Sequence, residues 1–557
     1  MILAFEFNYV SNNGVLENLL KEIASDFGIN HKIIRNESIV TLFVEADEAQ
    51  LGSFADTLSA SLPLSIFFKS SSVEVLDTMP EDKEVLPLMV YNIEFTPKIL
   101  ASVDTPSSPS YLSPFAIAPK DAHVKLLQEG KELLDVDTSK GYEKLYENVA
   151  ELIATGENVA IQTKNGHFVF GKIENSAACL NSEVSEVLAT DLSVVERMVV
   201  SRENEIKALA SLERPAIRFK VNALYAQKEI LSQARVELRL ADDLFLYQLC
   251  KRLFAKGVQF LFKASVQHCK STYAVDFEQP LKALEPLVVS VLENGAILIV
   301  QGHDYASSAL KASLKKFDEP SHAAFASIMQ EHKLFDTTAS CFYFSQTQND
   351  RIMHYSKEHG MLNLVEILLP KSFAELFAEI ERSSPSAERL VANYKEQFPE
   401  IYAKAISTDI PSDLPKSVYS LWKIAAMVLG ISDNFERAAE QLIENAEDFG
   451  GQKGPRIDYF LEKEDALSSD FNYVRLVRSG ISYKVAGTDN TTLSFGYMES
   501  LSFFLSDLAD EHKENLMSTK IALSGSLFAY KRFSEMLSKN LKPNHTICFN
   551  KELPIDQ

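Results

Sequence analysis

The spacing of apolar residues near the N-terminus predicts a small domain in which two helices cover one sheet. Residues 2–9 ("ILAFEFNY") form a predicted strand, and "HKIIR" (31–35) and "IVTLFVEA" (39–46) form two more, joined through "NES". A second helix from about Glu48 to Ala60 and a strand within 64–76 complete a βαββαβ order, which predicts a ferredoxin-like α+β domain over residues 1–78. The stripe that predicts the first helix consists of Val15, Leu16, Leu19, Leu20, Ile23 and Phe27.

The pattern changes twice further along the chain. Residues 79–124 are expected to be a linker region, because 102–119 are rich in Ser and Pro, which interrupt regular structure. Residues 125–275 mix predicted strands and amphipathic helices and therefore indicate a second α+β domain. Its predicted elements are strands at 158–163, 167–173 and 258–264 and a helix at 242–254.

The last part, residues 280–557, is expected to begin with a strand pair at 287–301, followed by a strand in "CFYFS" (341–345) and a helical middle. Gly430 is well placed to end a helix whose apolar stripe includes Trp422, and we interpret that stripe as core packing. The stretch 473–497 ("YVRLVRSGISYKVAGTDNTTLSFGY") predicts a β-meander, with a hairpin at "VAGTDNTT", and a helix then runs to about Asp510.

Near the C-terminus, "IALSGSLFAYKRF" (521–533) predicts a strand, a small-residue turn and a helix. Such a turn can direct backbone N–H groups at a phosphate, and it can equally be a tight connection, since a single glycine is far from a Gly-rich loop. We expect Gly525 to be there for backbone geometry, through a positive φ or a lack of room for a Cβ.

Length, charge and composition narrow the class of protein. At 557 residues the chain is too long for a single core, and its 46% hydrophobic and 24% charged residues are ordinary for a globular protein. A formal net charge of −22 opposes contact with nucleic acid, and no apolar run is long enough for membrane insertion. The N-terminus has no basic region before its apolar residues, so we expect a cytoplasmic protein.

Cysteine and histidine spacing points away from metal chemistry. The five cysteines contain no Cys-x-x-Cys pair and are odd in number, so we expect reduced, structural thiols. His354 and His359 are five residues apart, which would put them on different sides of a helix, and a paired or exposed role is favoured over a metal site.

Several short strings, in this order along the chain, resemble the HypF-type carbamoyltransferases of [NiFe]-hydrogenase maturation, and more closely their shortened, degenerate HydE-like relatives. The strings are "GINHKIIRNESIV" (28–40), "ELIATGENVAIQTKNGHFVFGKI" (151–173), "SLWKIAAMVLGISDNFERAAEQLIENAED" (420–448) and "IALSGSLFAYKRFSEML" (521–537). The resemblance implies an α+β and α/β multidomain fold. It comprises an acylphosphatase-like domain at 1–78, a degenerate YrdC-like domain at 125–275 and a C-terminal domain at 280–557 of sugar-kinase and heat-shock-ATPase type.

The resemblance also implies ATP, carbamoyl phosphate and zinc or iron as cofactors, and hydrogenase subunits or other maturation proteins as partners. The chain departs from the family at the residues that would hold these groups. Leu16 stands where the family has the phosphate-binding Arg, so Asn36 is expected to be vestigial as a catalytic residue. Arg197 and Arg202 lie among acidic residues where a basic run should be, and we interpret them as surface residues.

Only a few residues carry over as binding candidates. Ala264 and Ser265 are the remaining plausible contacts of the YrdC-like domain. His303 and Asp304 fall where the family has a Gln-His-x-Gly-Asp string and are candidate metal residues, as structural or as functional residues. Ser524, Gly525 and Ser526 are expected to keep the shape of a nucleotide-binding turn. We therefore favour a non-catalytic maturation scaffold; carbamoyl transfer through replaced residues, and an unrelated assembly protein, stay open, and so does whether the chain is an enzyme.

Overall fold

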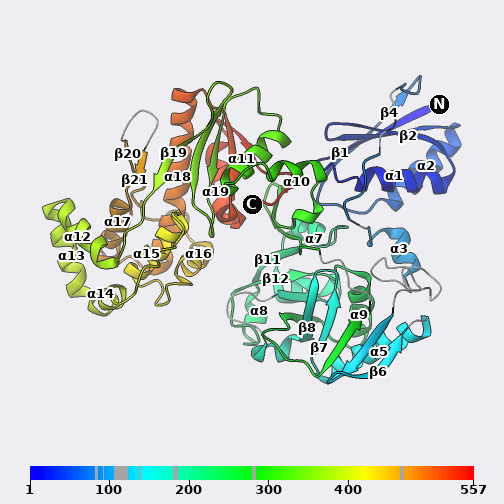
Figure 1. The fold of residues 1–557 in the computed structure, drawn as a ribbon, viewed down its shortest axis with the longest axis horizontal. Coiled ribbons are helices and arrows are strands. Elements are labelled where there is room, and N and C mark those ends of the chain that lie inside the picture. The colour runs from blue at the N-terminus through cyan, green and yellow to red at the C-terminus, as the bar shows by residue number, and fades with distance from the viewer. Residues whose placement is uncertain are drawn as a thin grey trace. The chain divides into compact units, whose positions relative to one another are not determined.

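A computed structural model describes residues 1–81, 84, 86–91, 93–103, 105, 123–136, 139–179, 186–278, 284–463 and 469–556. The chain divides into two compact units (Figure 1). Unit 1 comprises Met1–Lys311 and Lys551–Leu553, and unit 2 comprises Ala312–Asn550 and Pro554–Gln557. Within the expected linker, residues 106–119 lie outside the described residues. Within the described ranges, no helix is both long and apolar enough to cross a membrane.

The N-terminal part of unit 1 confirms the predicted ferredoxin-like pattern. An antiparallel sheet has the strand order β2-β3-β1-β4, in which β1 pairs with both β3 and β4. The predicted apolar stripe is the buried face of α1. The elements are β1 (Ile2–Tyr9), α1 (Val15–Phe27), β2 (Asn30–Asn36), β3 (Ile39–Glu45), α2 (Glu48–Ser61) and β4 (Phe68–Leu76).

A larger mixed sheet forms the rest of unit 1. Along its main path the strand order is β16-β15-β11-β12-β9-β13-β8-β7-β14-β5-β6, with β10 paired to β11. The strands are β5 (Val124–Gln128), β6 (Lys131–Val136), β7 (Val159–Thr163), β8 (Gly166–Lys172), β9 (Glu186–Ala189), β10 (Val199–Val200), β11 (Ala216–Val221), β12 (Arg235–Arg239), β13 (Phe260–Ser265), β14 (Tyr273–Phe277), β15 (Val288–Val291) and β16 (Ile297–Gln301).

The helices of unit 1 are mostly short. Asp243 caps α9, the helix predicted at 242–254, by accepting a hydrogen bond from the Leu246 N–H. The helices and 3₁₀ turns are α3 (Pro97–Ser102), α5 (Ser139–Thr155), η2 (Ile173–Ala178), η3 (Leu192–Val194), α6 (Val195–Met198), α7 (Glu203–Leu209), α8 (Ala223–Ala226), α9 (Leu244–Ala255), η4 (His303–Tyr305) and α10 (Ser308–Leu314).

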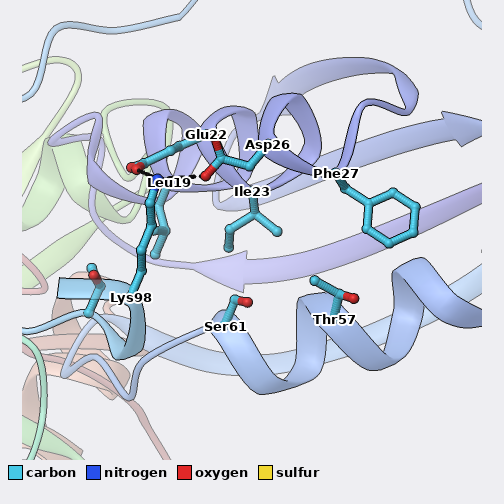
Figure 2. A pocket seen from close by; sticks show the side chains of 9 residues that line it. Leu19, Glu22, Ile23, Asp26, Phe27, Thr57, Ser61 and Lys98 are labelled. Atoms are coloured by element: carbon cyan, nitrogen blue, oxygen red, sulfur yellow. Dashed lines mark hydrogen bonds and ion pairs between the residues drawn. The ribbon is translucent and has the colours of Figure 1, made fainter. Parts of the chain in front are cut away.

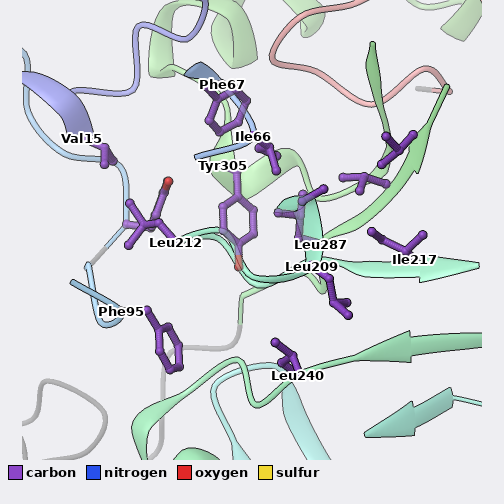
Figure 3. Close-up of a cluster of buried hydrophobic side chains, with 14 of the residues drawn as sticks. Val15, Ile66, Phe67, Phe95, Leu209, Leu212, Ile217, Leu240, Leu287 and Tyr305 are labelled. Carbon is purple, nitrogen blue, oxygen red and sulfur yellow. The ribbon is translucent and has the colours of Figure 1, made fainter. Parts of the chain in front are cut away.

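The two sheets of unit 1 share one hydrophobic core. Figure 3 shows Val15, Ile66 and Phe67 of the N-terminal part in the same buried cluster as Leu212, Ile217 and Tyr305. The Glu213 carboxylate accepts hydrogen bonds from the Ile66 N–H at 3.0 Å and the Ser65 hydroxyl at 2.6 Å, which fixes the segment before β4 to the larger sheet. Because β15 pairs with β11, the strand pair predicted at 287–301 extends this sheet, and the division between the units falls within α10 rather than near residue 280.

Unit 2 is a sheet with the strand order β20-β21-β19-β18-β17-β22-β23 and several helices. Its strands are β17 (Ala339–Tyr343), β18 (Arg351–Ser356), β19 (Gly360–Ile367), β20 (Leu461–Lys463), β21 (Ser469–Phe471), β22 (Lys520–Ser524) and β23 (Thr546–Cys548). Its helices and turn are α11 (Pro320–Glu331), α12 (Phe373–Ser383), α13 (Pro385–Gln397), α14 (Pro399–Ile406), α15 (Val418–Leu429), α16 (Ala438–Asp448), α17 (Tyr473–Val485), α18 (Asn490–Leu516), η5 (Ser526–Ala529) and α19 (Lys531–Leu541).

Helix α15 confirms the prediction for the Trp422 stripe. Gly430 ends the helix in the left-handed conformation with φ 63°, and Trp422 is fully buried. Its indole N–H donates to the Tyr459 hydroxyl at 2.7 Å, and that hydroxyl in turn donates to the Tyr497 carbonyl. The indole is therefore a core group with its polar atom satisfied.

The β-meander predicted at 473–497 is wrong, because this stretch forms α17 and the start of α18. The side chains of Asn472 and Asp489 accept hydrogen bonds from the N–H groups of Arg475 and Thr492, so each caps a helix N-terminus. The polar string that suggested a hairpin turn is the connection between two helices, with Gly487 at φ 87°.

His354 lies on β18 rather than on a helix and is buried beside the Ser340 hydroxyl, whereas His359 is exposed in the turn that follows. The expectation of reduced thiols is wrong for two cysteines. Cys179 and Cys269 form a disulfide although they are 90 residues apart in the sequence, a separation that gives no local signal. Cys250, Cys341 and Cys548 are free and buried, as expected.

The histidines of unit 2 predict a pH dependence of its stability. Burial, together with neighbouring His354 and His545, lowers the pKa of His512 from 6.5 to about 4, against an opposing effect of Glu511. Between these values the unfolded chain binds more protons than the folded one, so this contribution is complete above pH 6.5 and is lost as the pH falls toward 4. It amounts to about 3 kcal/mol at most.

The only tryptophan, Trp422, reports on unit 2. We expect the urea concentration at the midpoint of its fluorescence change to decrease when the pH is lowered from about 7 to about 5. The decrease should be smaller in His512→Gln, because glutamine cannot take up the proton. Exposed His359→Gln serves as the control. If the urea midpoint of His512→Gln decreased with pH as steeply as that of the wild type, His512 would not be the group responsible.

Candidate functional site

In the loop after β1, two backbone N–H groups donate to side chains of the same loop. The Asn13 N–H donates to the Ser11 hydroxyl at 3.2 Å, and the Val15 N–H donates to the Asn13 side-chain oxygen at 3.1 Å. Gly14 has a φ of 77°, and a Cβ there would lie 2.7 Å from the Leu88 carbonyl oxygen. The loop is thus closed against residues 87–90, and the Val90 N–H donates to the Asn13 carbonyl.

A guanidinium does reach this loop, which corrects the expectation that none would. Arg35 on β2 donates from Nε to the Glu17 carboxylate at 2.5 Å and from a terminal nitrogen to the Ser11 carbonyl at 2.7 Å. The Glu17 side chain is 1% exposed. Leu16 is buried in the core, as its apolar character requires, and Asn36 is an exposed residue at the end of β2, beside a hairpin turn. The Arg35 charge is therefore already paired.

A second group of buried charges, which we name the charged cluster, lies in the larger sheet of unit 1. Arg239 donates to Asp242 at 2.8 Å and also pairs with Glu186, while Lys263 pairs with Glu186 at 2.9 Å. Lys164 pairs with Glu94 at 2.9 Å. The cluster consists of Glu94, Lys164, Glu186, Arg239, Asp242 and Lys263.

The charges of this cluster stabilise one another. Burial alone would raise the pKa of Asp242, but the positive charges of Arg239 and Lys164 hold it below its ordinary value. The pKa of Glu186 is lowered in the same way, against its burial, by Arg239 and Lys263. An added anion would therefore have to displace a buried carboxylate from its partner.

The predicted contacts Ala264 and Ser265 follow Lys263 on β13. Ala264 is 7% exposed, and the Ser265 hydroxyl accepts a hydrogen bond from the Gln267 N–H at 3.2 Å. Arg197 and Arg202 are exposed, at the end of α6 and at the start of α7. The sequence signal that could have revealed the cluster is Lys263 itself, a charge inside the apolar strand "FLFKAS".

His303 and Asp304 hold a neighbouring segment in place. The Glu285 carboxylate accepts hydrogen bonds from the His303 backbone N–H at 2.8 Å and approaches its ring Nδ1 at 3.0 Å. The Asp304 carboxylate accepts from the Glu285 N–H at 2.9 Å. Among the residues that the structure describes, no group of three His, Cys, Asp or Glu side chains could hold a metal ion. The metal assignment of this pair stays a prediction.

One surface pocket of about 210 Å³ lies between α1 and α2 (Figure 2). Leu19, Ile23 and Phe27 line it, and Lys98 crosses one end in ion pairs with Glu22 at 2.7 Å and Asp26 at 2.6 Å. The pocket contains none of the candidate catalytic, nucleotide-binding or metal-binding residues.

In unit 2, the Ser524–Ser526 turn is bound tightly to the end of β17. Gly525 has a φ of 102°, and a Cβ there would lie 2.1 Å from the Phe344 carbonyl oxygen. The Phe344 N–H donates to the Ser524 carbonyl, and the Leu527 N–H donates to the Phe344 carbonyl. Both reasons expected for a glycine here, a positive φ and no room for a Cβ, are present.

The Asp556 carboxylate lies in this turn. One of its oxygens accepts hydrogen bonds from the Ser345 hydroxyl at 2.6 Å and the Ser526 N–H at 3.2 Å, and the other accepts from the Tyr343 hydroxyl. The Ser526 hydroxyl accepts from the Gln346 N–H at 2.9 Å. The donors that could hold a phosphate therefore already hold a carboxylate or one another.

The loop between β17 and β18 carries a second buried carboxyl. Asp350 accepts hydrogen bonds from the Ser345 N–H at 2.8 Å and the Val418 N–H at 2.6 Å, which ties the loop to the start of α15. Burial raises its pKa well above the ordinary value, and nearby Asp556 raises it further.

No protein-family model matches the chain. Protein HydE of Wolinella succinogenes is 25% identical to it over 579 residues, which cover 100% of both proteins. The crystal structure of full-length HypF in its phosphate- and nucleotide-bound form matches with a TM-score of 0.64 and 14% identity, over 100% of this chain and 96% of that one. The crystal structure of T. kodakarensis HypF matches with a TM-score of 0.69 and 12% identity, over 99% of this chain and 96% of that one.

The chain has the HypF-type fold. Its resemblance to HydE along the whole length agrees with the order of strings found in the sequence. The predicted site residues are not brought to one place. Asn36, Ala264 and Ser265 and the pair His303 and Asp304 lie in different parts of unit 1, and the 524–526 turn lies in unit 2.

The side chains that pair with the polar groups at these loops were not predicted from the sequence. Arg35 is 18 residues from Glu17, and Asp556 is 211 residues from Ser345, so no local pattern joins them. The loop donors with an identified partner, the N–H groups of Asn13, Val15 and Ser526, already bind side chains of the chain itself, so a phosphate would have to displace them.

Gly525→Ala should destabilise unit 2 by about 2–5 kcal/mol, because a methyl group would clash with the Phe344 carbonyl and the positive φ would be strained. Gly487→Ala is the matched control, since Gly487 also has a positive φ but nothing lies within 4 Å of its missing Cβ. That variant should lose only about 1 kcal/mol. Urea unfolding followed by Trp422 fluorescence measures both. Equal losses of unfolding free energy in the two variants would contradict the close approach of Gly525 to the Phe344 carbonyl.

Proposed function

We propose that this chain is an accessory protein of [NiFe]-hydrogenase maturation that acts as a non-catalytic scaffold of HypF-type shape. The HypF-type fold and the full-length similarity to HydE support the maturation part of the proposal. The non-catalytic part rests on one observation in particular. Two N–H groups of the loop after β1, those of Asn13 and Val15, and the Ser526 N–H of the 524–526 turn donate to the chain's own side chains.

The domain names belong to the same proposal. Residues 1–78 would correspond to an acylphosphatase-like domain, 125–275 to a YrdC-like domain and 280–557 to the kinase- and ATPase-like domain. The ferredoxin-like strand order of the first sheet supports the first of these assignments. Hydrogenase subunits or other maturation proteins would be the partners, in the cytoplasm, and the net charge of −22 argues against nucleic acid.

Carbamoyl transfer with ATP and carbamoyl phosphate is the second candidate. Arg35 at the first loop and the three cations of the charged cluster favour it, because phosphate transfer needs positive charge. Each of these cations has a carboxylate partner, however, and freeing one would expose an unpaired buried charge at a cost of several kcal/mol. The scaffold is therefore the better-supported function.

We expect no binding of ATP with a dissociation constant below about 1 mM, because neutral hydroxyls and amides do not repay the desolvation of three phosphates. Titration calorimetry with ATP and magnesium on the full chain measures this. A micromolar constant that is lost in Ser526→Ala would favour the carbamoyltransferase instead.

Deleting the gene should reduce [NiFe]-hydrogenase activity while the residual enzyme keeps the infrared bands of its cyanide ligands, because a scaffold acts on assembly rather than on ligand synthesis. Complementation with the wild-type gene is the control. Loss of the cyanide bands would indicate a role in ligand synthesis. Fully mature and active hydrogenase in the deletion strain would contradict the proposed function.

A further inference from the structure

Three donors in unit 2 converge on a single carboxylate. The Tyr343 hydroxyl, the Ser345 hydroxyl and the Ser526 N–H all donate to Asp556. Tyr343 and Ser345 are 0% and 1% exposed, so their positions are set by the core and not by the carboxylate. We name Tyr343, Ser345 and Ser526 the donor triad.

The surrounding backbone holds the donor triad rigidly. Gly525 leaves no space between its turn and Phe344, and the Gly525 N–H donates to the Ile555 carbonyl. The Ser345 hydroxyl also accepts hydrogen bonds from the Thr347 and Gln348 N–H groups at 3.2 and 3.1 Å, which directs its proton toward Asp556. The donors would therefore keep their arrangement if the carboxylate left.

The carboxylate itself is the exposed part of the arrangement. Asp556 is only partly buried, whereas Pro554 and Ile555 before it are buried. Because Asp556 is not fully buried, an anion of similar size could replace its carboxylate at the same donors. We propose that the donor triad is a binding site for a small oxyanion, which Asp556 of the same chain occupies as a built-in ligand.

The charges nearby limit the ligand to a single negative charge. The three donors of the triad are neutral groups, and the Asp350 carboxyl lies beside them, since it accepts a hydrogen bond from the Ser345 N–H at 2.8 Å. A doubly charged anion would have no cation in the triad to offset its second charge. A carboxylate is the ligand that matches, and phosphate, which is partly doubly charged at neutral pH, should bind more weakly. The inference concerns this turn alone and stands whether or not the chain serves hydrogenase maturation.

The test removes the built-in ligand and supplies a free one. Asp556→Ala should unfold at a lower temperature than the wild type in sodium chloride, and sodium acetate of equal ionic strength should restore about 2–4 °C of the loss. Half of the acetate effect is expected at an acetate concentration on the order of 10 mM, and phosphate should raise the unfolding temperature by less than acetate does. The wild type should show no difference between acetate and chloride, because Asp556 already occupies the donors.

Two further variants keep the test specific. Asp336→Ala removes an exposed carboxylate of unit 2 and should not gain from acetate. Tyr343→Phe combined with Asp556→Ala removes one donor of the triad and should lose most of the acetate effect. If Asp556→Ala folds only when acetate is present, the inference is supported. If neither acetate nor phosphate stabilises Asp556→Ala beyond chloride, or if both stabilise the wild type equally, the inference is overturned.

Discussion

The Arg239 guanidinium is almost fully buried, and it is stable there because Glu186 and Asp242 neutralise it. These groups come from neighbouring strands of the larger sheet and the loop beside them. Arg239 ends β12, Glu186 begins the adjacent β9, Lys263 lies on β13 next to β9, and Asp242 follows β12. Breaking such a buried pair costs about 3–5 kcal/mol, because the remaining charge is left uncompensated. The centre of the unit 1 sheet therefore depends on these pairs as much as on its apolar core.

The need to pair every buried polar group also explains the turns that resemble phosphate sites. A buried N–H or hydroxyl needs an acceptor, and a protein whose phosphate ligand is absent most of the time would leave such donors unsatisfied. In this chain the Ser11 and Asn13 side chains accept from two N–H groups of the first loop, and Asp556 accepts from the Ser526 N–H. Glu17 accepts from the Arg35 guanidinium. A HypF-type fold can thus be kept without its ligands. This is the physical basis of the scaffold that we propose.

The sequence predicted those elements whose signals are local. The ferredoxin-like order, α9 and α15 follow from apolar periodicity, and Asp243 and Gly430 mark helix ends by their side-chain and backbone chemistry. The prediction failed for α17 and α18, where Val, Ile and Thr favoured strands and the capping role of Asn472 and Asp489 was not recognised. Glycine geometry at residue 525 was predictable because it concerns one position. Three pairs of partners were not predictable, because only the folded chain brings their members together. They are Arg35 with Glu17, Cys179 with Cys269, and Ser345 with Asp556.

The release of phosphate from carbamoyl phosphate tests most directly whether the chain's own groups fill these sites. Because the Arg35 guanidinium is paired with Glu17 and the loop donors are satisfied, the full chain should release phosphate no faster than buffer alone, with or without ATP. Repeated turnover by the wild-type chain that disappears in Arg35→Met, while the variant stays folded, would contradict the account.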